Sequence, residues 1–237
     1  MKSYIDELDR NIFNFVEYEG YDDRYPSLSM QAFSSDFYDE IRHASRRLFQ
    51  IFCKAAKVFQ MAPDDFARNM DMPDNLIPYL HKSNALGLPT WLSRFDFVLD
   101  VNGNLRMVEL NADTPCFLIE SYYANEVAAN YVGRKHPNIE CRKELHTFLK
   151  RMYDAVLSAK YGRNQYESMR ANRESLPKDP FVFSCFHDYF EDYGTTQFLM
   201  RELKTACPEA DTRFISFYDM KIDDEGIPLE DGSHATL

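Results

Sequence analysis

The chain has 237 residues, of which 45% are hydrophobic and 15% aromatic, enough to bury the core of one large or two small domains. It has 27 Lys and Arg residues against 38 Asp and Glu residues, and the resulting net charge of −11 argues against nucleic acid as the main partner, because phosphate binding requires a basic surface. No run approaches the roughly 20 apolar residues that span a bilayer, and the five widely spaced cysteines indicate free thiols in a reducing cytoplasm.

The first part of the chain is predicted to be helical. We expect a short helix near Ile5–Tyr18 and a long helix over Ser35–Gln60, where apolar residues recur at steps of three and four. That apolar stripe is expected to face the core, and it comprises Phe37, Ile41, Ala44, Leu48, Ile51, Ala55 and Val58. Two further helices are predicted to start near Pro63 and Pro73, where acidic residues follow a proline.

A β-hairpin is predicted over residues 94–111. Asn102 and Gly103 separate two alternating runs, and Asn-Gly is the strongest short hairpin signal because both central residues of a type I′ turn need a positive φ. With these two residues in the turn, alternation along the strands directs one set of side chains toward the core. That set is Phe95, Phe97, Leu99, Val108 and Leu110.

The other face of the predicted hairpin carries two polar pairs, with Asp96 opposite Glu109 and Arg94 opposite Asn111. The Cβ atoms of the two acids would lie roughly 5 Å apart, and like charges directly opposed destabilise a sheet. Either Arg94 or a divalent ion would balance them, and two carboxylates with an amide carbonyl suit Mg²⁺. The plainer alternative is an exposed face with ordinary charges. A loop of three or five residues would shift the pairing and turn Glu109 to the opposite face.

The second strand leads into a predicted helix from Pro115 to Tyr131, with Asp113 or Thr114 as its N-cap. The free N–H groups and positive dipole end of this helix would point at the polar face of the hairpin. A carboxylate or a phosphate would suit that position. The plainer alternative is an ordinary capped junction between a strand and a helix.

The last part of the chain is predicted to contain a β-α-β unit after a helix over residues 138–160. Strands at residues 181–186 and 213–217 flank a helix at 195–206, an order that predicts a parallel pair. Ligands bind beyond the C-terminal ends of such strands. The polar residues there are His187, Asp188, Glu191 and Asp192. We therefore predict an α+β or α/β fold, with a helix-rich region over residues 1–178 around the hairpin and a β-α-β segment over 179–237.

Two sets of motifs in the chain resemble the glutathionylspermidine synthase family, a branch of the ATP-grasp carbon–nitrogen ligases. The first set is Arg94-Phe95-Asp96-Phe97 together with Met107 to Pro115, and the second is Phe183-Ser184-Cys185 followed by Glu191-Asp192 and the Asp224-Glu225-Gly226 turn. The resemblance covers the chain from about residue 85 to its end. It implies that ATP phosphorylates a carboxylate and that an amine then attacks the acyl phosphate to form an amide.

The resemblance also implies roles for individual residues. The implied Mg²⁺ ligands are Asp96, Glu109 and Asn111. Arg94 would stabilise the transferred phosphoryl group and the tetrahedral intermediate. A glutathione-like peptide would be bound by Asp113, Thr114 and Cys116, and a spermidine-like polyamine by Glu191 and Asp192. The family often has a small hydroxyl residue after the proline, whereas this chain has Cys116 and Phe117, so the acyl substrate stays open.

The resemblance places most of the ATP-binding residues in a C-terminal half that would begin where this sequence stops. None of the three common glycine motifs GxxxxGK[ST], GxGxxG and GxSxG occurs. We therefore expect the N-terminal portion of a ligase, inactive alone. One alternative is a truncated non-catalytic domain that binds a cation or polyamine in an acidic pocket. A metal-assisted hydrolase is a weaker alternative, because no histidines cluster near the carboxylates.

Overall fold

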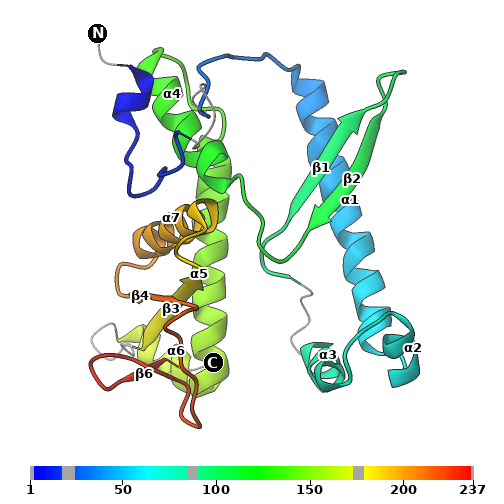
Figure 1. The fold of residues 1–237 in the computed structure, drawn as a ribbon, viewed down its shortest axis with the longest axis vertical. Coiled ribbons are helices and arrows are strands. Elements are labelled where there is room, and N and C mark those ends of the chain that lie inside the picture. Colours follow the sequence, from blue (N-terminus) through cyan, green and yellow to red (C-terminus); the bar gives the residue numbers. More distant parts are fainter. Residues whose placement is uncertain (1–2, 18–24, 85–89, 173–178, 236–237) are drawn as a thin grey trace. The chain divides into compact units, whose positions relative to one another are not determined.

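The computed structural model describes residues 3–17, 25–84, 90–172 and 179–235. They divide into two compact units, and each is described by itself below (Figure 1). The first unit combines Met1–Leu28 with Cys116–Leu237, and the second is Ser29–Pro115. The division predicted at residues 178 and 179 lies inside the first unit, and both sides of it contribute to one hydrophobic core.

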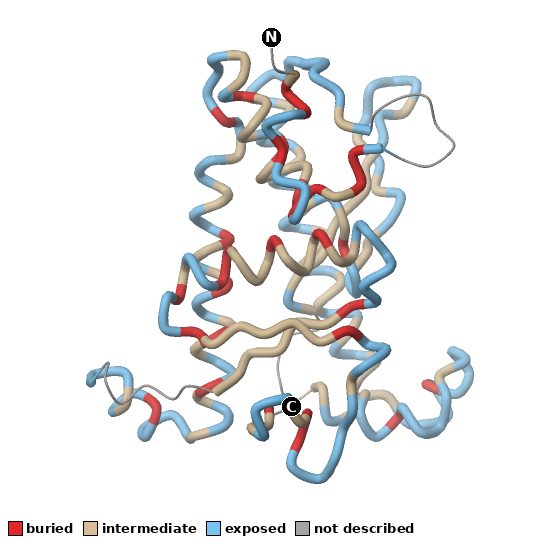
Figure 2. Tube along the Cα trace, turned by 60° about the vertical axis from the view of Figure 1, so that its left-hand side comes forward, coloured by how far each residue is buried: buried red, intermediate tan, exposed pale blue. Residues whose placement is uncertain are grey.

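The first unit is predominantly helical, with two small sheets. Its elements are the 3-10 helix η1 (Tyr4–Glu7), the π-helix η3 (Ile119–Ala124), α4 (Asn125–Tyr131), α5 (Ile139–Tyr161), α6 (Arg163–Ala171), β3 (Pro180–Cys185), α7 (Phe190–Ala206), β4 (Asp211–Ser216), β5 (Ile227–Pro228) and β6 (His234–Ala235). Its core is built on α5, whose buried residues recur at helical spacing. These residues are Leu145, Leu149, Tyr153 and Leu157. Figure 2 colours the buried residues of the chain red.

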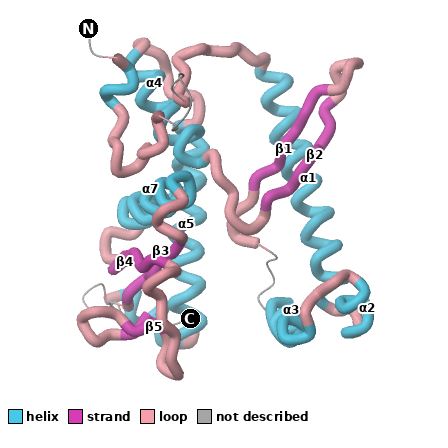
Figure 3. The backbone as a smooth tube through the Cα atoms, in the orientation of Figure 1, coloured by secondary structure: helices cyan, strands magenta, loops and turns pink. Residues whose placement is uncertain are grey.

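The predicted β-α-β unit is confirmed. β3 and β4 pair in parallel over their whole length, from Pro180 opposite Asp211 to Cys185 opposite Ser216, and α7 is the crossover helix that packs on both strands (Figure 3). The helix begins at Phe190, five residues earlier than predicted. The acidic residues Glu191 and Asp192 therefore lie in its first turn and not in a preceding loop.

The N-terminal segment packs on α7 at a glycine. A Cβ atom added to Gly194 would lie 2.5 Å from the backbone oxygen of Ile12, so only glycine allows this close crossing. The helix predicted over Ile5–Tyr18 is wrong within the described residues, because η1 ends at Glu7 and residues 8–17 contain turns and extended segments. Phe13 and Phe15 are buried there and stack with ring centroids 4.5 Å apart. Tertiary packing thus overrides local helix propensity in this segment.

The second unit contains α1 (Ser35–Gln60), α2 (Asp64–Asn69), the 3-10 helix η2 (Asp74–Leu76), α3 (Ile77–Asn84) and the hairpin strands β1 (Arg94–Leu99) and β2 (Leu105–Asn111). The bounds of α1 match the prediction, and Ser34 caps it by accepting a hydrogen bond from the backbone N–H of Phe37 at 3.1 Å. The apolar face of the hairpin packs on α1, where the rings of Phe52 and Phe95 lie 6.0 Å apart.

Together these elements confirm a helix-rich α+β fold with small sheets. Within the described part of the chain, no helix has the length and apolar character needed to cross a membrane.

Candidate functional site

The hairpin brings the four predicted polar residues together in the predicted pairs. Arg94 lies opposite Asn111, and Asp96 lies opposite Glu109. Directly paired residues share one face of a sheet, so one arginine, two carboxylates and one amide project from the same surface. The sequence therefore located the central residues of this candidate site correctly with respect to one another.

The turn that joins the strands differs from the predicted one. The loop spans residues 100–104, and the pairs next to it are shifted by one residue, so that Val98 faces Arg106. A register irregularity follows between Asp96 and Phe97, where β2 accommodates Val108 as an extra residue. This bulge restores the predicted register. It also leaves Val108 63% exposed, and Leu99 beside the loop is 55% exposed, so the predictions that Val108 and Leu99 line the core are wrong.

The loop takes its form from Asp100 more than from Asn102-Gly103. The Oδ1 atom of Asp100 accepts hydrogen bonds from the backbone N–H groups of Asn102 at 2.9 Å and Asn104 at 2.8 Å, and Oδ2 accepts one from Arg106 at 3.0 Å. These hydrogen bonds, led by that of Asn104, hold the pKa of Asp100 below its usual range. Gly103 has a φ of 79°, whereas Asn102 does not have a positive φ, so no type I′ turn forms.

Arg94 and Asp96 form a bidentate ion pair along one strand. Arg94 donates from Nε to Oδ1 at 2.7 Å and from Nη2 to Oδ2 at 3.0 Å. The hydrogen bonds from the guanidinium lower the pKa of Asp96, so the carboxylate stays ionised well into the acidic range. The pair also fixes the plane of the guanidinium, the geometry that suits recognition of a phosphate or carboxylate.

The oxygen donors on this face are of the kind that magnesium prefers. Glu109 is exposed, and the side-chain oxygen of half-buried Asn111 accepts a long contact, 3.4 Å, from the N–H of Asp113. Among the described residues, no three or more His, Cys, Asp or Glu side chains gather in a way that could hold a metal. A site here would therefore depend on two carboxylates, one amide, water and substrate oxygens, which is the usual arrangement for Mg²⁺.

The predicted helix start at Pro115 is wrong. Phe117 has a φ of 78°, outside the helical region, so regular structure begins only after it, with the π-helix at Ile119. Asp113 and Thr114 are exposed and do not cap a helix, because residues 113–117 are non-helical. The first helical N–H groups thus lie further along the chain than the sequence predicted.

Within the first unit, the structure places Cys116 beside Asp192. The Cys116 thiol donates to Oδ1 of Asp192 with an S···O distance of 3.8 Å. Glu191 is exposed on the first turn of the same helix. A residue predicted to contact the acyl substrate therefore touches one predicted to contact the amine. No local sequence pattern indicates this contact, because the two residues are 76 positions apart.

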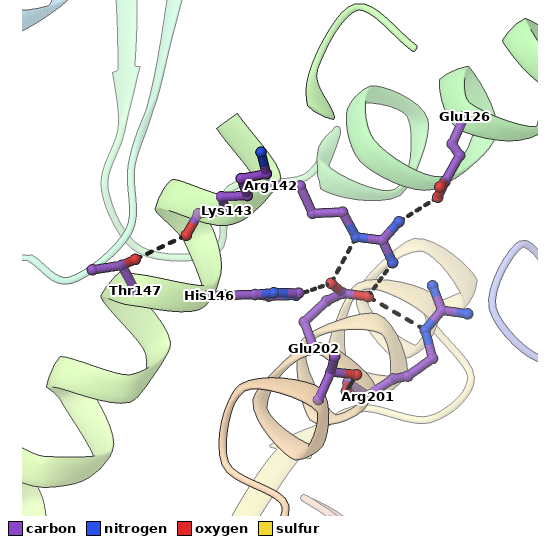
Figure 4. A network of polar contacts seen from close by, with 8 residues as sticks. Glu126, Arg142, Lys143, His146, Thr147, Arg201 and Glu202 are labelled. Atoms are coloured by element: carbon purple, nitrogen blue, oxygen red, sulfur yellow. Dashed lines mark hydrogen bonds and ion pairs between the residues drawn. The ribbon is translucent and has the colours of Figure 1, made fainter. Parts of the chain in front are cut away.

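An ion network that was not predicted from the sequence joins α5 and α7 (Figure 4). Glu202, with a side chain only 1% exposed, accepts hydrogen bonds from Nε and Nη2 of Arg142 at 2.9 and 2.8 Å and lies 2.6 Å from Nε2 of His146. Burial alone would raise the pKa of Glu202, but the hydrogen bonds from Arg142 and His146 lower it overall. One feature of the sequence could have indicated that Glu202 is buried, because this acid lies between Phe198 and Leu203, two buried residues of the same helix.

A family model described as glutathionylspermidine synthase preATP-grasp matches residues 4–235, which is nearly the whole chain. No curated protein matches the sequence.

Proposed function

The chain belongs to the glutathionylspermidine synthase family, and on this basis we propose that it is the pre-ATP-grasp part of an ATP- and Mg²⁺-dependent ligase that joins a carboxylate to an amine. Such a reaction needs two steps, because a carboxylate does not react with an amine without activation. A carboxylate oxygen first attacks the γ-phosphorus of ATP, and ADP leaves. The amine nitrogen then attacks the acyl carbon, the bond to phosphate breaks with its electron pair, and the nitrogen loses a proton.

The hairpin face is the observation that carries this proposal. Asp96, Glu109 and Asn111 present hard oxygen donors on the surface from which Arg94 also projects. When bound there, Mg²⁺ would neutralise charge on the phosphate oxygens of ATP. Arg94, held in place by Asp96, would stabilise the transferred phosphoryl group and the tetrahedral intermediate. A fixed donor of this kind commonly contributes about 3 kcal/mol of transition-state stabilisation.

The chemistry of the side chains suggests which residues would contact each of the two organic substrates. Asp113, Thr114 and Cys116 would contact the carboxylate substrate, a glutathione-like peptide. Glu191 and Asp192 would pair with the ammonium groups of a spermidine-like amine. The contact between Cys116 and Asp192 supports the idea that the two substrates meet beside the start of α7. The alternative of a non-catalytic binding domain is not favoured, because the matched family is named for a synthase.

The test is ADP release by the protein as its gene encodes it, supplied with ATP, Mg²⁺, glutathione and spermidine. We expect activity that requires all four, and we expect Asp96→Asn and Glu109→Gln to lower it by at least about 10²-fold. Asp39→Asn, a change at an exposed site on α1, is the matched control and should leave activity unchanged. Full activity in either site variant would refute the assigned roles.

A further inference from the structure

The parallel sheet of the first unit has an open edge. Within the described residues, β4 pairs with β3 alone and no strand lies on its other side. A parallel sheet of two strands is unusually small, and an uncovered edge strand offers a row of backbone groups to any further strand.

A groove of about 910 Å³ runs along this edge. Its lining includes four consecutive residues of β4, from Arg213 to Ser216. Successive side chains of a strand point to opposite faces, and a groove that follows the strand edge contacts residues of both kinds. Phe190 and Tyr193 of α7 also line it, as do residues 228–230, which begin at the last residue of β5.

The backbone of β4 presents hydrogen-bonding groups to the groove. In a parallel pair, the N–H and C=O of one residue point to the same side, and the side alternates along the strand. The Phe217 N–H donates to Cys185 at 3.0 Å, and the Ile215 carbonyl accepts from the Ser184 hydroxyl at 2.6 Å, so these residues point toward β3. Phe214 is the residue before Ile215, so by this alternation it directs its N–H and C=O to the other side, into the groove.

The charge on the groove selects the kind of peptide. Arg213 is neutralised by Asp211 at 2.7 Å and by Asp231 at 2.6 Å. The carboxylates of Asp219 and Glu230 also line the groove and have no ion pair in the described part of the chain. The remaining charge is negative, which favours a ligand with basic side chains.

We propose that the open edge of β4 is a peptide-binding groove, in which an extended segment with basic side chains adds to the sheet as a third strand. The backbone of the ligand pairs with Phe214, and its basic side chains face Asp219 and Glu230. This interaction is separate from the ligase chemistry, and its test uses no activity measurement.

The probes are short, capped peptides of alternating valine and lysine, the same peptides with glutamate for lysine, and lysine peptides N-methylated at alternate backbone amides. Binding to the protein as its gene encodes it is followed by fluorescence anisotropy, and amide exchange is followed by NMR. We expect the lysine peptide to bind best and to slow exchange at Phe214 by about tenfold or more. Exchange at Ile215 should not change, because its N–H already points toward β3. Asp219→Asn should weaken binding of the lysine peptide, whereas its matched control, Asp224→Asn at an exposed position outside the groove lining, should not.

Three results would overturn the proposal. The first is failure of every unmethylated peptide to bind. The second is equal binding of the N-methylated peptide, or binding that leaves exchange at Phe214 unchanged. The third is self-association of the chain that slows exchange at Phe214 without peptide, which would make a second copy the occupant.

Discussion

Asp96 and Glu109 lie directly opposite each other on paired strands, although the loop between those strands shifts the register by one residue. The bulge at Val108 cancels the shift before the pairing reaches the polar residues. Two irregularities, a five-residue loop and a bulge, thus give the same pairing as a two-residue turn. Bulges often redirect side chains beside functional sites, and here one keeps Glu109 on the face of Asp96.

Because Val108 is the extra residue of the bulge, its side chain should contribute little to stability. Val108→Ala should change the free energy of unfolding by less than about 0.5 kcal/mol. Leu110→Ala, at a partly buried position on the same strand, should cost about 1–2 kcal/mol, less than a fully buried leucine. Urea denaturation measures both. A larger loss for Val108→Ala than for Leu110→Ala would contradict the bulge.

The bidentate pair between Arg94 and Asp96 predicts that lysine cannot replace Arg94. Arg94→Lys keeps the charge but loses the planar pair of donors, so ligase activity should fall by about 10²-fold or more. The pKa of Asp96 should rise toward its usual value, which carboxyl NMR titration reports. The control is Arg106→Lys, on the same hairpin and 64% exposed. It should change neither the ligase activity nor the pKa of Asp96. An unchanged Asp96 pKa in Arg94→Lys would show that the pair does not form.

Much of this hairpin and of the α-helices could be predicted, because periodicity and turn residues are local signals. The stripe on α1 shows the limit of such signals. Its spacing averages 3.5 residues per turn, whereas an α-helix has 3.6, so the face drifts by about 20° per heptad. Ile51 and Val58 accordingly become exposed, at 56% and 69%, and Phe52 and Phe59 are partly buried in their place.

The bulge and the contact between Cys116 and Asp192 could not be predicted for a different reason. Both depend on tertiary packing that no short window of sequence encodes. The same is true of the partners of Glu202. Helical periodicity indicates that this acid has buried neighbours, and a buried acid requires a cation nearby. It does not identify that cation as Arg142, which is 60 residues away.

The network around Glu202 predicts a large loss of stability when only one partner is removed. Glu202→Gln leaves the half-buried Arg142 without its main counter-charge and should cost about 3 kcal/mol at pH 7. Because the folded pKa of Glu202 is lowered, this contribution is present at neutral pH and is lost as the pH falls through that folded value. Glu140→Gln, in an exposed pair with Lys143, should cost less than about 0.5 kcal/mol. Similar losses for the two variants in urea denaturation would rule out a special role for the network.

His136 predicts a second pH dependence of stability. Here the folded state favours the neutral form of the side chain, whereas for Glu202 it favours the charged form. His136 is 6% exposed, and neither ring nitrogen has a partner among the described residues. Burial is the main cause that lowers the pKa of His136. The negative charge of Glu126 raises this pKa, and the positive charge of Arg142 lowers it. The neutral form is favoured in the folded state, so stability is present above pH 6.5 and falls as the pH drops below it, by at most about 1.4 kcal/mol per unit. His136→Gln should flatten the dependence between pH 7 and 5, and His43→Gln, at an exposed site, should not. A slope unchanged in His136→Gln would refute the assignment.

The last prediction concerns the effect of the Phe117 backbone conformation on stability. A bulky residue with a φ of 78° is strained, and Phe117 is 55% exposed, so its side chain gains little from burial. Phe117→Gly should relieve the strain and raise the free energy of unfolding by up to about 1 kcal/mol, whereas Phe117→Ala, which keeps the Cβ, should not. The two variants lose the same ring, so the difference between them isolates the backbone term. A glycine variant no more stable than the alanine variant would disprove the strain. Strain next to Cys116 is expected to serve substrate positioning, so the glycine variant should bind the carboxylate substrate more weakly than the alanine variant, with a higher KM in the ADP-release assay.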